Sequence, residues 1–382
     1  MDIDKLLKFM VDKGASDAFI TAGVAPSLKI NGKVMPVSDH QLSPEQVHKA
    51  VLSVMTDAQK EEFETQHECN FAVAREEVGR FRASAYYQRN LPGMVLRRIE
   101  TTIPTVEDLK LPAVIKELAM TKRGLVIFVG ATGTGKSTSL AAMIGYRNRN
   151  STGHIISIED PIEFVHEHAG CIVSQREVGI DTDSFEVALK NTLRQAPDVI
   201  MIGEVRTKET MEQAITFAET GHLCLCTLHA NNANQALDRI QHFFPVERHD
   251  QIWMDLSLNL KGMVAQQLVP TKDGKSRRAV IEVLLNTPLV SDLIRKGEVH
   301  LLKELMANSN EHGMQTFDQA LFRLYKEGAI DEEKALAHAD SRNDLRLMIK
   351  LDADGGDALA SAPELTVSGG EEDGDHPGRF MR

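Results

Sequence analysis

The sequence predicts an α/β protein in which a small α+β domain precedes a larger domain built around a parallel β-sheet. Two patterns support this prediction. After about residue 112, short apolar runs alternate with helix-like segments, as a parallel sheet covered by helices requires. Before residue 100, alternating segments flank Asn31-Gly32, a dipeptide typical of an antiparallel hairpin. A chain of 382 residues is long enough for two or three domains.

The N-terminal domain is predicted to span residues 1–100. Apolar residues between positions 6 and 10 have the spacing of a first helix, and residues 27–37 form the expected hairpin. The sequence Ser43-Pro44-Glu45-Gln46 combines an N-cap, a first-turn proline and a capping box. We therefore expect a second helix to begin there and to run toward Gln66.

Two strands that carry arginine close this domain. Strict alternation over residues 80–87 places Arg80 and Arg82 on one face, and after a turn at Pro92-Gly93 a partner strand carries Arg97. A solvated edge face explains this pattern. The alternative interpretation is a basic surface turned toward the phosphates of a nucleotide held elsewhere.

The rest of the chain divides into four predicted segments. A Thr-Thr-Ile-Pro-Thr break opens a linker over residues 101–112, which leads into the parallel-sheet core at 113–245. Residues 246–350 are predicted to be mainly helical, with one hairpin-like interruption at 272–275. Residues 351–382 are rich in acids and glycine and too poor in apolar residues to pack, so we expect a disordered acidic tail.

A complete G-x-x-x-x-G-K-[ST] phosphate loop lies between an apolar strand at 125–129 and a helix-like segment at 139–144. Its glycines let the backbone N–H groups face a phosphate, Lys136 supplies a positive charge, and Ser137 can hold Mg²⁺. The sequence thus predicts a nucleoside triphosphate site formed by Gly130, Ala131, Thr132, Gly133, Thr134, Gly135, Lys136, Ser137 and Thr138.

Acidic residues follow the next two predicted strands. Residues 155–158 lead into Glu159-Asp160-Pro161-Ile162-Glu163, at the end of the strand where open α/β sheets bind ligands. Glu163 could activate the attacking water, whereas Glu159 or Asp160 could simply favour a helix N-terminus. Residues 199–202 lead into Glu204, the pattern of an acid that holds Mg²⁺, here through water.

A third strand is bounded by two histidines, His222 and His229. If the strand is extended, seven steps at roughly 3.3 Å separate the imidazoles by about 23 Å, so they cannot meet at one phosphate. His229 belongs beside the nucleotide. His222 should face another surface, either a subunit interface or a purely structural environment.

Composition limits the classes of function. The net charge of −12 argues against a sequence-independent nucleic-acid-binding surface. No apolar run approaches the roughly 18 residues of a membrane span, and no signal-peptide pattern opens the sequence, so we expect a cytoplasmic protein without membrane insertion. The four cysteines have no metal-ligand spacing.

Together these motifs resemble those of the secretion ATPases of type II secretion and type IV pili, and within that superfamily the PilT/PilU family of pilus retraction ATPases. The resemblance covers residues 1 to about 345. It implies a PAS-like N-terminal domain and a RecA-like P-loop ATPase domain with a helical C-terminal part. It also implies a hexamer at the pilus base, on the cytoplasmic side of the inner membrane, where ATP hydrolysis with Mg²⁺ drives a platform protein, pilus retraction and twitching motility.

The resemblance assigns roles residue by residue. Lys136 and Ser137 would bind phosphate and Mg²⁺, and Glu163 would be the catalytic glutamate. Glu204 would be the acid linked to Mg²⁺, and His229 would sense the γ-phosphate.

Other positions connect the domains or distinguish the family branch. Arg82 and Arg97 match N-terminal-domain arginines that the family uses near the nucleotide, which favours the functional interpretation of that basic face. Residues 289–296 keep only the Leu-Ile-Arg of the retraction-motor signature Ala-Ile-Arg-Asn-Leu-Ile-Arg-Glu, and residues 193–198 lack the Glu-Asp that usually precedes the proline in that family. With the acidic tail, these differences resemble PilU.

Two other functions fit parts of this pattern. One is a nucleotide-binding accessory scaffold to a paralogous principal retraction motor, with dispensable hydrolysis. The other is a related secretion or conjugation ATPase, whose DNA-motor version the negative charge disfavours.

Overall fold

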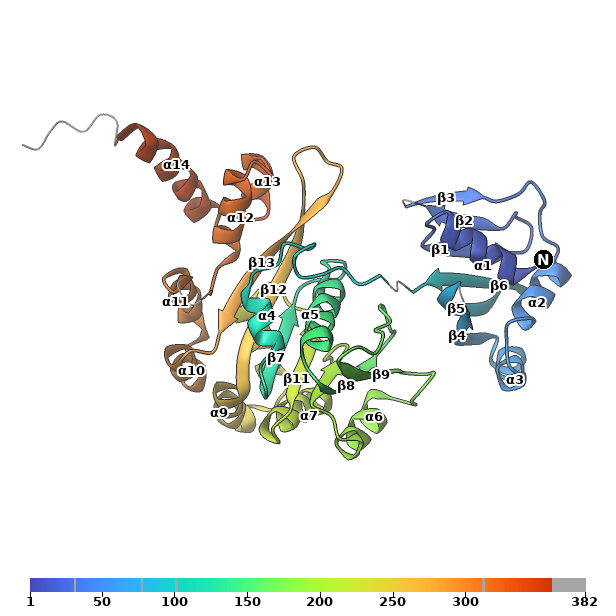
Figure 1. Ribbon diagram of the computed structural model, residues 1–382, viewed down its shortest axis with the longest axis horizontal. Coiled ribbons are helices and arrows are strands. Elements are labelled where there is room, and N and C mark those ends of the chain that lie inside the picture. The colour runs from blue at the N-terminus through green and yellow to red at the C-terminus, as the bar shows by residue number, and fades with distance from the viewer. Residues whose placement is uncertain (31, 77, 100–101, 311–312, 359–382) are drawn as a thin grey trace, which may run out of the picture.

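The computed structural model describes residues 1–30, 32–76, 78–99, 102–310 and 313–358. The chain forms two sheets, each with its own helices (Figure 1). The first is antiparallel, in the order β3-β2-β1-β6-β5-β4. Its elements are α1 (Ile3–Asp12), β1 (Asp17–Thr21), β2 (Ser27–Ile30), β3 (Lys33–Pro36), α2 (Pro44–Leu52), α3 (Asp57–Gln66), β4 (Glu68–Arg75), β5 (Gly79–Gln88) and β6 (Leu91–Arg98).

The helices of the first domain begin where side chains can cap them. Ser43 and Gln46 form the predicted capping box of α2. The expected single helix toward Gln66 is two helices, because Thr56 and Gln59 form a second capping box that starts α3. The predicted segment therefore contains two N-terminal capping sites, and a separate helix begins at each.

The hairpin between β5 and β6 turns earlier than predicted. Its two turn residues are Arg89 and Asn90, both with positive φ, so the prediction of a turn at Pro92-Gly93 was wrong. Gly93 is paired with Tyr86, and a Cβ on Gly93 would approach the Tyr86 ring to 3.0 Å. This glycine therefore serves close packing inside the sheet.

The second sheet has the order β13-β12-β7-β11-β10-β8-β9, and all its neighbours are parallel except β12 and β13. Its strands are β7 (Gly124–Val129), β8 (Gly153–Glu159), β9 (Cys171–Glu177), β10 (Val199–Ile202), β11 (Leu223–Leu228), β12 (Leu260–Pro270) and β13 (Arg277–Leu285). Its helices are α4 (Val114–Ala119), α5 (Lys136–Asn150), α6 (Phe185–Thr192), α7 (Lys208–Glu219), α8 (Ala233–His242), α9 (His249–Asn259), α10 (Pro288–Arg295), α11 (Leu302–Ala307), α12 (Phe317–Lys326), α13 (Glu332–Ala337) and α14 (Arg342–Ala358).

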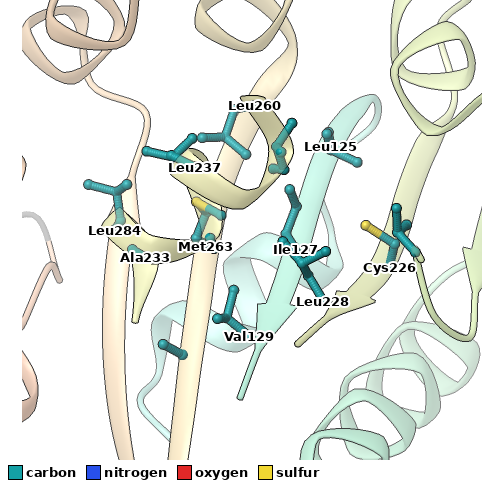
Figure 2. Packing of buried hydrophobic residues seen from close by; sticks show 14 of the residues in the cluster. Leu125, Ile127, Val129, Cys226, Leu228, Ala233, Leu237, Leu260, Met263 and Leu284 are labelled. Carbon is teal, nitrogen blue, oxygen red and sulfur yellow. The ribbon is translucent and has the colours of Figure 1, made fainter. Parts of the chain in front are cut away.

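Alternation along β7 supplies both layers of the core. Leu125, Ile127 and Val129 pack in one cluster with residues of α8, β11 and β12 (Figure 2). Val126 and Phe128 point to the opposite face and pack with α4 and α5. All five side chains are fully buried, as expected for a central strand covered on both faces.

Three segment boundaries differ from the sequence prediction. The segment 246–350 contributes β12 and β13 to the same sheet as the phosphate loop, so a boundary at 245 would divide that sheet. Val106 and Leu111 of the predicted linker are buried against the second domain. Helix α14 continues through Ala358, into the predicted tail, and the rest of the tail, 359–382, lies outside the described residues.

Candidate functional site

Four parallel strands end at one edge of the second sheet and surround a cavity of about 270 Å³. The loop after β7 contributes Lys136 and Ser137, and the segment after β8 contributes Glu163. Glu204 follows β10 and His229 follows β11. The parallel sheet thus brings together acids, a histidine and the phosphate loop, which lie far apart in the sequence.

The backbone of the phosphate loop adopts conformations that require glycine. Gly133 and Gly135 have φ values of +77° and +84°, which a residue with a Cβ rarely adopts. Gly130 packs so closely that a Cβ would lie 2.7 Å from the Gln266 carbonyl oxygen. The amide of Gln266 on β12 donates to the carbonyl of Thr134 at 2.8 Å. Gln266 was not predicted as a site residue, because no local motif links it to a loop 132 residues away.

The ammonium group of Lys136 lies within this loop. Its Nζ donates to the carbonyl oxygens of Gly130 at 2.7 Å and Ala131 at 2.8 Å. Burial lowers the pKa of Lys136, although the negative charges of Glu204 and Glu163 oppose this effect. Two carboxylates therefore help to keep a buried ammonium charged beside the position expected for the phosphates.

Glu204 contacts two basic side chains, His229 and Arg206, beside the cavity. One oxygen lies 3.0 Å from His229 Nε2, and the other accepts a hydrogen bond from Arg206 at 2.7 Å. Burial raises the pKa of Glu204, but Arg206, His229 and Lys136 outweigh burial and lower it below its ordinary value. Burial and the nearby cation Lys136 lower the pKa of His229, so a neutral imidazole can donate its Nε2–H to Glu204.

The two glutamates around the end of β8 differ in environment. Glu163 is exposed and lines the cavity. Glu159 is buried, and its Oε1 accepts hydrogen bonds from Ser157 Oγ at 2.6 Å and Gln175 Nε2 at 3.1 Å. Burial raises the pKa of Glu159 to about 7. Since β8 is followed by β9, the interpretation of Glu159 or Asp160 as a helix N-terminus was wrong.

The arginines of the first domain do not line this cavity among the described residues. Arg82 and Arg97 are paired across β5 and β6. Arg97 donates to the buried carboxylate of Asp17 at 2.8 Å. Arg82 acts electrostatically on Glu177, the last residue of β9.

His222 lies at the other end of β11 from His229. Its Nδ1 lies 3.1 Å from the Thr220 hydroxyl and 3.3 Å from the Phe217 carbonyl oxygen. The structure confirms that the two histidines occupy opposite ends of the strand, and it places His222 in a local helix-end environment.

A phosphate loop between a buried strand and a helix, with carboxylates at the ends of neighbouring parallel strands, defines the class of P-loop nucleotide-binding proteins. The family model "Type II/IV secretion system protein" matches residues 2–319. The chain belongs to this family of secretion ATPases, and its relatives place it among the PilT/PilU ATPases.

Several relatives match nearly the whole chain. The chain is 71% identical over 386 residues to the type IV pilus ATPase PilU of Pseudomonas aeruginosa, covering 100% of both proteins. It is 40% identical to the type IV pilus retraction ATPase PilT of the same organism, over 88% of this chain and 97% of that protein.

Solved structures agree with the architecture. A crystal structure of the pilus retraction motor PilT with bound ADP has a TM-score of 0.85 and 39% identity, covering 91% of this chain and 100% of that chain. The Legionella pneumophila ATPase DotB has a TM-score of 0.75 and 26% identity, covering 91% of this chain and 95% of that chain. In the described part of the chain, no helix combines the length and apolarity that a membrane crossing requires.

Proposed function

We propose that this protein is a hexameric motor that hydrolyses ATP and powers or assists type IV pilus retraction and twitching motility. The observation that carries the proposal is the shared cavity of the phosphate loop, Glu163, Glu204 and His229. The names of the PilU and PilT relatives support the pilus as the system served.

In the proposed reaction, the loop from Gly130 to Thr138 binds the phosphates through its backbone N–H groups and Lys136. A phosphate oxygen gives the Lys136 ammonium a charged acceptor in place of the carbonyls of Gly130 and Ala131. Glu163 accepts a proton from the attacking water. His229 lies where it can respond to the γ-phosphate and relay this contact to Glu204.

The oxygen ligands in the cavity fit Mg²⁺. The Ser137 hydroxyl and the Glu204 carboxylate both line it, and the lowered pKa of Glu204 keeps its carboxylate ionised. When bound, Mg²⁺ would neutralise charge on the phosphates, with Glu204 holding it through water.

The proposed assembly is a homo-hexamer on the cytoplasmic side of the inner membrane at the pilus base. Its proposed partners are an inner-membrane platform protein and a paralogous retraction ATPase. Arg82 and Arg97 would complete the nucleotide site when the N-terminal domain closes on it, within one chain or from a neighbouring chain. His222 is a candidate for a subunit interface.

Two substitutions test the proposed chemistry. Lys136→Ala removes the charge inside the phosphate loop and should abolish both ATP binding and turnover. Glu163→Gln retains the side-chain shape and should preserve binding while reducing turnover by at least about 100-fold. Radioactive phosphate release and equilibrium binding measure the two properties separately. Wild-type turnover in Glu163→Gln would refute the role of this acid.

A second candidate function is an accessory scaffold to a principal retraction motor. The departure of residues 289–296 from the retraction-motor signature favours it, and these residues form most of α10, where Leu289 is exposed. Complementation distinguishes the two functions. If Glu163→Gln restores motility to a deletion strain as fully as wild type does, hydrolysis by this protein is dispensable.

A further inference from the structure

The segment that carries Glu163 lies between β8 and β9, outside the helices and strands. A carboxylate on such a segment needs external contacts to hold a fixed position over the cavity. We propose that Gln175 of β9 is a positioning residue that fixes the Glu163 carboxylate for catalysis. This inference rests on the proposed catalytic function of Glu163.

The Gln175 amide forms hydrogen bonds to this segment through both its nitrogen and its oxygen. Its Nε2 donates to the carbonyl oxygen of Phe164 at 2.8 Å and to Glu159 Oε1 at 3.1 Å. Its Oε1 accepts the backbone N–H of His166 at 2.7 Å. These contacts hold the chain one and three residues after Glu163.

Glu159 and Glu177 contact the backbone at Glu163 and at the residue before it. Glu159, already bound to Gln175, lies close enough to the Glu163 backbone for that backbone to lower its pKa, against the larger effect of burial. At β9, Glu177 Oε2 accepts the backbone N–H of Ile162 at 3.3 Å. Backbone contacts from position 162 to position 166 therefore converge on side chains of β8 and β9.

Strand register explains why these side chains meet. In the parallel pair, Gln175 lies opposite Ser157, and Glu177 lies opposite Glu159. All four therefore share one face at the end of the two strands, and Ser157 donates to Glu159 at 2.6 Å. A strand pair within a larger sheet is a rigid base, so the position of Glu163 is set by the sheet.

Glutamine is suited to this position because its planar amide carries donors and an acceptor together. Leucine has a similar size and can make none of the three hydrogen bonds. Glutamate keeps an acceptor for His166 N–H, but when ionised it cannot donate to Phe164 and places a second negative charge against Glu159. Both substitutions should release the Glu163 segment while leaving the phosphate loop intact.

Steady-state kinetics of the full-length protein test the inference. We expect Gln175→Leu and Gln175→Glu to lower kcat by about 10- to 100-fold, because a displacement of about 1 Å can have such an effect. The KM for ATP and the affinity for a non-hydrolysable ATP analogue should stay within about twofold. Ser174→Ala is the matched control, since Ser174 is adjacent on β9 but its hydroxyl lies against His154. Its kcat should equal that of wild type.

A double-mutant cycle separates positioning from a merely structural role. The single-turnover rate of ATP hydrolysis is measured for each variant, and the rate of Lys136→Ala gives the level of signal without catalysis. When Glu163 is already replaced by glutamine, Gln175→Leu should not lower this rate any further. An equal fold-loss in both backgrounds would overturn the inference, as would wild-type kcat in the single variants. If Gln175→Leu does not fold, Gln175→Glu carries the same cycle. Wild-type turnover in Glu163→Gln alone would instead refute the proposed function of that acid, so the two failures are distinguishable.

Discussion

Replacement of Gln266 by leucine should weaken ATP binding without destabilising the fold. The Gln266 side chain is buried, and its Nε2 donates to the Thr134 carbonyl at 2.8 Å. Within the described residues its Oε1 is buried without a hydrogen-bond partner. The substitution thus removes one hydrogen bond, worth about 0.5–1.5 kcal/mol, together with one unpaired oxygen that costs about 1–3 kcal/mol.

These two effects oppose each other. The free energy of unfolding of the variant should lie between about 0.5 kcal/mol below and about 2.5 kcal/mol above that of wild type. The phosphate loop loses its contact with β12, and a loss of about 1 kcal/mol in preorganisation raises the KM for ATP about fivefold. Urea denaturation and steady-state ATPase kinetics measure the two quantities.

Gln267→Leu is the matched control, because it makes the same change at the next position of β12, on the opposite face of the strand. Its KM should match that of wild type. A loss of more than about 0.5 kcal/mol in the unfolding free energy of Gln266→Leu would lie outside the expected range and would contradict the cost assigned to the unpaired oxygen. An unchanged KM would show that this amide does not hold the loop for ATP.

Two further predictions concern stability. Burial raises the pKa of Glu159 to about 7, above the ordinary 4.5 of an unfolded glutamate. Between pH 4.5 and 7 the unfolded chain therefore binds fewer protons than the folded chain. The free energy of unfolding of the wild-type protein should fall as the pH rises through this window. Denaturation at several pH values should show a smaller loss for Glu159→Gln, and equal slopes would contradict the assignment. Leu237→Ala deletes a fully buried side chain of α8 that lies near Leu260 and Met263 of β12, and it should lower the free energy of unfolding by about 2–5 kcal/mol (Figure 2). A urea midpoint equal to that of wild type would contradict this expectation.

The site residues that could be predicted from the sequence are those whose positions follow from a local motif or from the direction of a strand. A glycine loop between a buried strand and a helix fixes the surroundings of Lys136 within a few residues. The carboxyl ends of parallel strands share one edge, so acids that follow consecutive strands meet there. Glu163, Glu204 and His229 could therefore be assigned to one cavity before the strand order was known.

The missed features depend on contacts between distant segments. The sequence predicted only a hairpin-like interruption at residues 272–275 in a mainly helical segment, and it could not show that β12 pairs with β7 in the nucleotide-binding sheet. Gln266 and Gln175 have no motif of their own, and their importance comes from the backbone groups opposite them. Pro92-Gly93 looked like a turn because sequence cannot show that Gly93 accommodates the Tyr86 ring.

The contacts of the two predicted arginines separate their roles in a way that strand alternation could not. Arg97 is bound to Asp17, whose carboxylate is buried, so moving Arg97 to a nucleotide would leave a buried charge without its partner. Arg82 instead acts on Glu177, which accepts the backbone N–H of Ile162. Glu177 also lies in the field of Arg80, so in the proposed motor a movement of Arg80 and Arg82 together would change the electrostatic environment of the segment that carries Glu163.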